Sequence, residues 1–190
     1  MIRENFGAVC GHPCWGIRWD SQTNLALNFG NPRLKIRDMR ASSLLGGPRR
    51  LVVVKGQWQL WITHAYWRLE LRNGLTVTGS TSRRKILKAL ARLNGEKLRS
   101  VAVRPDTGAT SFSFDLGSTL AVRRFEKDSV DDLWILFKPS GYVLAVNGRG
   151  EITHHRGSVP QDEVKWRALR KIAPDHLRAQ CRLSGNQGAA

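Results

Sequence analysis

The sequence predicts a mainly β fold of the α+β class, either an antiparallel two-layer sandwich or a partly open barrel, with two helices. Short apolar segments alternate with clusters of Gly, Pro, Asn and Asp, as in an antiparallel meander. Within 111–116, Phe112, Phe114 and Leu116 fall on one face, the period of a half-buried strand. Two other segments have helical spacing. The length of 190 residues fits one domain, expected over residues 1–183.

The strands are expected between turns rich in Pro and Gly. Pro105–Gly108 and Pro139–Gly141 combine a residue of fixed φ with one that tolerates a left-handed conformation, and Asn147-Gly148 marks a further tight turn. Residues 40–50 have loop composition without periodicity and are expected to be mobile, and 184–190 are expected to form a disordered tail. The expected strands are 15–19, 25–29, 34–37, 51–54, 58–63, 67–71, 75–78, 98–104, 111–116, 118–125, 133–137, 142–146 and 151–154.

Two helices interrupt this pattern. The first is predicted near 82–93, after the cap candidates Ser80–Ser82 and before Asn94-Gly95. Its apolar positions Ile86, Leu90 and Leu93 share one side. The second is predicted near 162–173, before Pro174, with its apolar face formed by Val164, Ala168 and Ile172.

Charge is the strongest compositional signal. The chain has 31 Lys and Arg against 15 Asp and Glu, a net charge of +16. Residues 1–100 hold +13 of this, whereas 101–150 are neutral. Such a balance favours an anionic partner, either nucleic acid or an acidic protein.

Composition also excludes several classes. A hydrophobic content of 41% argues against a wholly disordered chain. No apolar run approaches the roughly 18–20 residues of a membrane span, and the N-terminus lacks the apolar core of a secretory signal, so no membrane partner is expected. Three cysteines are an odd number in a chain that does not need disulfides, and they indicate a reducing, cytoplasmic location.

The basic side of the first helix is the main candidate anion site. Cations in the first turn oppose the helix dipole, at a cost of roughly 0.3–1 kcal/mol each, and a bound phosphate would relieve that cost. The alternative is an ordinary solvated face. The candidate residues are Arg83, Arg84, Lys85, Lys88 and Arg92.

A second candidate combines cations with aromatic side chains that could stack on bases. Trp58, Leu60 and Ile62 alternate and are expected to face inward together, which leaves Trp61 as the exposed aromatic of that strand. The other cations and aromatic of this candidate lie on the predicted helix near 162–173. The alternative for that helix is a structural role, docked on the sheet. A helix bound to a membrane surface is disfavoured, because the apolar face of this helix is narrow. The candidates are Lys165, Trp166, Arg167, Arg170, Lys171 and Trp61.

Catalytic and metal chemistry have weaker support. Cys10, His12 and Cys14 have the spacing of half a zinc site, but no second ligand pair follows, so neither metal nor cofactor is expected. His154 and His155 could serve a metal-independent phosphodiesterase, yet adjacent strand residues point to opposite faces. We therefore expect no catalytic residue and no enzymatic activity.

The segments FGNPRLKIRD, GQWQLWITHAYWRL, ARLNGEKLRSVAV and FSFDLGSTL resemble a family of uncharacterised small bacterial β-rich proteins. They span about two thirds of the chain. The resemblance implies a bacterial, cytoplasmic β-rich domain and transfers no functional residue.

The leading hypothesis from the sequence is a non-enzymatic basic protein that contacts nucleic-acid phosphates, alone or as an accessory subunit of a nucleoprotein complex. The alternative is an immunity-type or inhibitor module that neutralises an acidic protein partner. DNA, RNA and acidic protein all remain open as partners, as does the oligomeric state.

Overall fold

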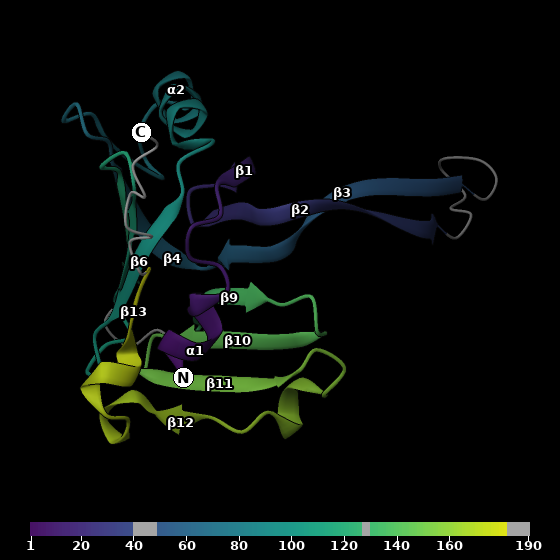
Figure 1. Ribbon diagram of the computed structural model, residues 1–190, viewed down its shortest axis with the longest axis vertical. Coiled ribbons are helices and arrows are strands. Elements are labelled where there is room, and N and C mark those ends of the chain that lie inside the picture. Colours follow the sequence, from purple (N-terminus) through teal and green to yellow (C-terminus); the bar gives the residue numbers. More distant parts are fainter. Residues whose placement is uncertain (40–48, 127–129, 182–190) are drawn as a thin grey trace, which may run out of the picture.

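The computed structural model describes residues 1–39, 49–126 and 130–181, which form two antiparallel sheets packed against each other (Figure 1). A continuous core takes buried side chains from both sheets. The sheets have separate strand orders and do not close into one barrel. The predicted mainly β, two-layer antiparallel fold is therefore confirmed, in its sandwich form.

The first sheet has seven strands in the order β1-β2-β3-β9-β10-β11-β12. Its longest members, β2 and β3, have 16 and 14 residues, and each joins two strands that were predicted separately. Leu27, Leu60 and Leu136 lie side by side across its centre and are buried. The strands are β1 (Cys14–Ser21), β2 (Asn24–Met39), β3 (Arg49–Ile62), β9 (Asp132–Phe137), β10 (Tyr142–Asn147), β11 (Glu151–Arg156) and β12 (Arg167–Ala168).

The second sheet has six strands in the order β13-β6-β7-β8-β4-β5. Alternation along β7 buries Phe112 and Phe114 as predicted from the sequence, because successive side chains of a strand point to opposite faces. Leu116 lies beyond β7 and is exposed, contrary to that pattern. The strands are β4 (Ala65–Glu70), β5 (Thr76–Thr78), β6 (Leu98–Val103), β7 (Thr110–Phe114), β8 (Thr119–Arg124) and β13 (Arg178–Gln180).

Large aromatic side chains fill the space between the sheets. Trp134 is fully buried and its Nε1 donates a hydrogen bond to Thr110 Oγ1 at 2.7 Å, which satisfies its one polar atom. The ring of Phe6 meets that of Trp134 edge-on, with centroids 5.6 Å apart. Phe6 belongs to a short helix that the sequence analysis did not predict, α1 (Ile2–Gly7), which buries Ile2 and Phe6 one turn apart.

The first predicted helix is confirmed as α2 (Arg83–Leu93), with Ser82 at its N-cap. Ile86, Leu90 and Leu93 are buried, as their spacing predicts. Ala89 is buried with them. Asn94 ends the helix and its backbone N–H donates to the carbonyl of Leu90 at 3.0 Å. The opposite side of α2, which carries the cations, is exposed.

The predicted helix at 162–173 is wrong. This segment contains the 3-10 turns η1 (Gln161–Glu163) and η2 (Leu169–Lys171), separated by extended chain and β12. Val164, Trp166 and Ala168 are half-buried while Lys165 and Arg167 are exposed, a period of two. Positions 164 and 168 share a face in a helix and in a strand alike, but only the extended form also turns Trp166 to that face.

Further along, Pro174 begins the 3-10 helix η3 (Pro174–Leu177), which leads into β13. Residues 40–48 of the loop predicted at 40–50, and the tail predicted at 184–190, lie outside the described residues. Within the described ranges, no helix is both long and apolar enough to cross a membrane.

Candidate nucleic-acid interface

The outer parts of β2 and β3 form a two-stranded ribbon that runs out beyond the rest of the described chain (Figure 1). We call residues 31–39 and 49–57 the arm. The arm begins at a bulge, where the register of the two strands shifts between Phe29 and Pro32. Gly56 allows this close approach, because a Cβ there would lie 2.7 Å from the carbonyl oxygen of Phe29.

The arm has two chemically different faces. Paired residues of an antiparallel ribbon share a face, and the pairs Arg33 with Lys55, Lys35 with Val53 and Arg37 with Leu51 alternate with pairs of the other face. We call this face, which continues the outer surface of the first sheet, the basic face. Within the described residues it has no carboxylate. Its cations are Arg33, Lys35, Arg37, Arg49 and Lys55.

Cations repel one another at the root of the basic face. Partial burial, and then repulsion by Lys35, Arg37 and Arg18, lower the pKa of Lys55 below its usual range. Arg18 comes from β1 and lies beside Ala26 of β2, which in turn lies beside Trp61 of β3. Cations from three strands therefore act on one another at the root, and an anion bound there would relieve their repulsion.

Trp61 adjoins this cluster. It points away from Leu60 and Ile62, as the sequence predicted, and it is half-buried rather than fully exposed. Its ring centre lies 5.8 Å from Nζ of Lys55 and 4.8 Å from the ring centre of Phe137. Trp58 points to the core side and is partly buried there, also as expected.

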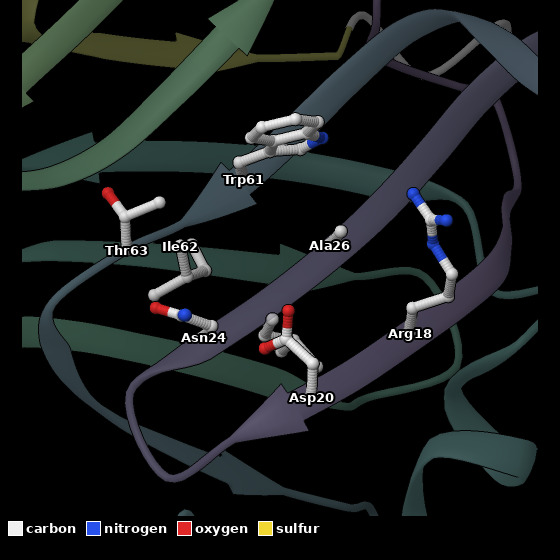
Figure 2. A pocket seen from close by; sticks show the side chains of 8 residues that line it. Arg18, Asp20, Asn24, Ala26, Trp61, Ile62 and Thr63 are labelled. Carbon is white, nitrogen blue, oxygen red and sulfur yellow. The ribbon is translucent and has the colours of Figure 1, made fainter. Parts of the chain in front are cut away.

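A pocket of about 340 Å³ opens beside Trp61 (Figure 2). Figure 2 shows the indole on the same side of the strands as Arg18 and Asp20 of β1. The indole Nε1 is buried and has no hydrogen-bond partner within the described residues. Because protein atoms cover this N–H, a ligand in the pocket would meet the rest of the indole ring and not this donor. The lining residues are Arg18, Asp20, Asn24, Leu25, Ala26, Trp61, Ile62 and Thr63.

The cations predicted on the first helix are where the sequence placed them. The first turn of α2 has no acidic residue, and Ser82 makes no side-chain cap bond. Within the described ranges no ion pair involves the exposed cations Arg83, Arg84, Lys85, Lys88 and Arg92. The neighbouring hydroxyls are occupied: Thr81 Oγ1 accepts from the backbone N–H of Thr78 at 2.9 Å, and Ser80 Oγ lies 3.0 Å from Thr78 Oγ1.

The C-terminal candidates do not form a common face. Lys165, Arg167, Arg170 and Lys171 are exposed, but without a helix they no longer form a stripe. Trp166 is half-buried over the outer surface of β9–β11, where it lines a cavity of about 200 Å³ together with His155 and Val143. Trp166 therefore helps to cover the sheet. This agrees better with the alternative role of the segment, a structural element docked on the sheet, than with an exposed stacking residue.

A second cationic surface lies on the outer side of the second sheet. Ala102, Ser111 and Ala121 are neighbours across β6, β7 and β8, and their small side chains form the floor of a trough of about 550 Å³. Arg178 and Arg68 stand at the two ends of this row. The sequence did not predict this trough, because the residues that form it come from strands that are far apart in the chain.

The charge of the trough is partly neutralised. Arg68 pairs with Glu70 at 2.7 Å and Arg104 pairs with Asp106 at 3.4 Å. The guanidinium of Arg123 instead covers the ring of Tyr66, 4.2 Å from its centre. The arm is the stronger candidate for a polyanion, because its basic face has no carboxylate among the described residues.

The cysteines do not form a cluster with the histidines. Cys14 Sγ donates to the carbonyl of Leu93 at 3.1 Å, and burial raises the pKa of this thiol to about 12. His12 packs on Trp58 instead, with ring centres 5.1 Å apart. Burial and then Cys181 raise the pKa of Cys10. Within the described residues, no three His, Cys, Asp or Glu side chains could hold a metal ion.

His154 and His155 lie on opposite faces of β11, as expected for adjacent strand residues. The ring of His154 stacks on Tyr142 with centres 5.1 Å apart, and its Nε2 lies 3.3 Å from Lys138 Nζ. His155 lies 3.2 Å from Thr153 Oγ1 and lines the cavity under Trp166. The two imidazoles therefore do not face one phosphate.

The chain was compared with known proteins, and no protein-family model, curated protein or solved structure matches it. The resemblance to uncharacterised bacterial β-rich proteins therefore stays a prediction. The geometry and charge of the arm are the basis of the function proposed next.

Proposed function

We propose that this protein is a cytoplasmic, non-enzymatic nucleic-acid-binding protein whose arm contacts the phosphate backbone. The observation that carries the proposal is the one-sided charge of the arm: five cations share the basic face, and the described residues place no carboxylate there. A ribbon that is solvated on both sides has no reason to keep its cations on one face. Binding of a polyanion to one face gives such a reason, because every cation on that face can then contact the partner.

The dimensions of the arm support this partner. A two-stranded ribbon fits the major groove of B-DNA, which is about 12 Å wide. Arg33, Lys35 and Arg37 recur at every second residue, which is about 6.6–6.8 Å along a strand. Since phosphates of one DNA strand advance by about 3.4 Å per base along the axis, this interval corresponds to about two phosphates.

The pocket beside Trp61 adds a site for an unpaired base. An indole offers a stacking face that accepts every base, and nearby cations hold the phosphates on either side. The carboxylate of Asp20, which also lines the pocket, can accept hydrogen bonds from donors on a base edge. The proposal therefore favours a single-stranded or locally unpaired segment at the root of the arm.

The alternative is an acidic protein partner, and one observation favours it. Leu51 is 45% exposed amid the cations of the basic face, and Val53 lies next to it on that face. Protein interfaces commonly surround an apolar centre with charge. A protein inhibitor would bind one partner with fixed stoichiometry, whereas a backbone binder would bind any long polyanion.

The test is to purify the full chain from its own cells at low salt and to identify what accompanies it. We expect an absorbance ratio that indicates nucleic acid and release of the bound material by heparin. A triple variant with Lys35, Arg37 and Lys55 changed to Gln should lose the nucleic acid. A matched control with the exposed residues Arg3, Arg72 and Arg149 changed to Gln should retain it. Recovery of a single acidic protein that heparin does not displace would refute the proposal.

A further inference from the structure

Two segments from opposite ends of the described chain meet along one edge of β6, the edge that does not pair with β7. β13 occupies the first part of this edge, and just after it the backbone N–H of Cys181 donates to the carbonyl of Arg99 at 2.9 Å. The N-terminal segment occupies the next part, since the N–H of Gly11 donates to the carbonyl of Leu98 at 2.9 Å. Cys181 and Cys10 therefore lie on the two sides of the junction between these segments.

The thiols of both cysteines reach across this junction. Cys10 Sγ lies 3.8 Å from the carbonyl oxygen of Arg99, the same oxygen that accepts from the backbone of Cys181. Cys181 Sγ donates to the carbonyl of Leu98 at 2.9 Å, the same oxygen that accepts from the backbone of Gly11. Burial, and then interaction with the thiol of Cys181, raise the pKa of Cys10, in agreement with this close placement.

The chemistry open to this pair is covalent. Cys10 and Cys181 are free thiols, and both are partly exposed. Within the described residues, no third His, Cys, Asp or Glu joins them in a group that could hold a metal ion. Two cysteines that face one gap can instead be joined by a disulfide, which needs Cα atoms roughly 4.4–6.8 Å apart. The third cysteine, Cys14, is buried and bonded to the carbonyl of Leu93, so it does not compete.

We propose that Cys10 and Cys181 form a reversible intramolecular disulfide when the protein meets a hydroperoxide such as hydrogen peroxide. In a reducing cytoplasm such a bond is transient, and its formation reports oxidation. Neither cysteine belongs to the arm or lines the pocket beside Trp61. The inference therefore goes beyond the proposed nucleic-acid binding and does not require it.

The reaction begins at Cys181, because burial raises the pKa of Cys10 and the thiolate is the attacking form. The sulfur of Cys181 attacks one peroxide oxygen, so that an S–O bond forms, the O–O bond breaks and hydroxide leaves with the thiol proton as water. The sulfur of Cys10 then attacks the resulting sulfenic acid. An S–S bond forms, the S–O bond breaks, and hydroxide leaves with the second thiol proton as water. Two thiols lose two protons and two electrons, and one peroxide becomes two waters.

The disulfide would stabilise the fold by tying its two ends together. It closes a loop from residue 10 to residue 181, which is almost the whole described chain, and a longer loop gains more from a cross-link. The N-terminal helix α1 is held as well, since the backbone N–H of Cys10 donates to the carbonyl of Phe6 at 2.9 Å. We expect the oxidised chain to melt about 5–15 °C higher than the reduced chain.

Peptide mapping of the full chain tests the proposal without nucleic acid. The chain is treated with hydrogen peroxide, the peroxide is removed with catalase, and the remaining thiols are alkylated after denaturation and before digestion. We expect one linked pair of peptides that contain Cys10 and Cys181, alkylated Cys14, and loss of the link on treatment with dithiothreitol. Alkylation of all three cysteines, a link to Cys14, or links only between separate chains would overturn the proposal.

Cys14→Ala is the matched control, and it should still form the disulfide and melt higher when oxidised than when reduced. Cys10→Ser should show neither effect. If the link forms but leaves the melting temperature unchanged or lowers it, the native fold does not bring the two sulfurs together, and the proposal fails. Dimedone, which captures sulfenic acids, should label Cys181 in Cys10→Ser faster than it labels Cys10 in Cys181→Ser. Equal labelling would overturn the order of attack.

Discussion

Lys55 and Trp61 lie on one side of β3, with the ammonium of Lys55 5.8 Å from the centre of the Trp61 ring. This relationship joins the basic face of the arm to the pocket beside Trp61, so that charge and a stacking surface meet at one place. A nucleotide offers both a phosphate and a planar base to such a site.

Replacing Trp61 should separate single-stranded from double-stranded binding. Stacking on an aromatic side chain contributes about 1–3 kcal/mol per base, so Trp61→Leu should weaken binding to a single-stranded oligonucleotide by roughly tenfold or more. Binding to duplex should change little. Fluorescence anisotropy with both oligonucleotides would measure this. Trp166→Leu is the control, since Trp166 covers a different part of the sheet. Equal effects of the two substitutions would contradict a stacking role for Trp61.

A charge change in the first turn of α2 should raise the stability of the fold and lower its affinity for oligonucleotides. Lys85 is the third helical residue after Ser82, so Lys85→Glu creates a capping box and removes an unfavourable charge from the first turn. We expect the free energy of unfolding to rise by about 1 kcal/mol in urea titrations. If α2 contacts phosphates, the affinity for oligonucleotides at low salt should fall.

Lys88→Gln is the control for this experiment, because it removes a cation from the middle of α2, away from the terminal dipole, without setting a carboxylate four residues from both Arg84 and Arg92. It should weaken binding while changing the free energy of unfolding by no more than about 0.5 kcal/mol. Unchanged oligonucleotide affinity in both variants would show that the cations of α2 form an ordinary solvated face.

His154 should make stability depend on pH. Partial burial, and then the nearby ammonium of Lys138, lower the pKa of His154 below its ordinary value of 6.5. As pH falls through that ordinary value, the unfolded chain takes up a proton before the folded chain, so stability decreases until the lower folded pKa is passed. His154→Gln should flatten the urea midpoint between about pH 7.5 and 5. A steeper dependence in the variant would contradict this assignment.

The lowered pKa of His155, caused by its burial, should leave some pH dependence in the His154→Gln chain. The variant with both histidines changed to Gln should therefore have the flattest profile. A double variant that is no flatter than His154→Gln would show that His155 does not contribute.

Gly79 should be among the least replaceable glycines of the fold. It lies between β5 and α2, where a Cβ would lie 1.7 Å from the backbone oxygen of Gln22 in the β1–β2 turn. Backbone cannot yield as a side chain does, so Gly79→Ala should destabilise by about 1–3 kcal/mol or more in thermal melting. Gly7→Ala is the control, with no atom within 4 Å of its Cβ, and it should be close to neutral. Similar melting of both variants would contradict this packing.

Local patterns predicted much of the fold. Alternation placed Phe112 and Phe114 in the core, and the cap residues with helical spacing placed α2 to within one residue. The side of β3 that carries Trp61 also followed from alternation. The segment 162–173 failed because Val164 and Ala168 fit a period of four as well as a period of two, and pairing with β11 selected the second.

The arm could be foreseen only in part. The order Arg33, Leu34, Lys35, Ile36, Arg37 already places three cations on one face of a strand and two aliphatic groups on the other. What the sequence does not contain is the point at which β1 and β9 stop covering β2 and β3. That depends on tertiary pairing, and it turns an ordinary half-buried strand pattern into an exposed amphipathic ribbon.

The salt dependence of oligonucleotide binding tests the central claim most directly. If the interface neutralises 6–10 phosphates, affinity should fall by about 10³–10⁵ between 50 and 200 mM salt. Changing Lys35, Arg37 and Lys55 to Gln should reduce the slope of log K against log salt by about 2–3, since each lost duplex contact contributes about 0.9. Binding that is insensitive to salt, or a triple variant with the wild-type slope, would contradict the assignment of the basic face as the phosphate-binding surface.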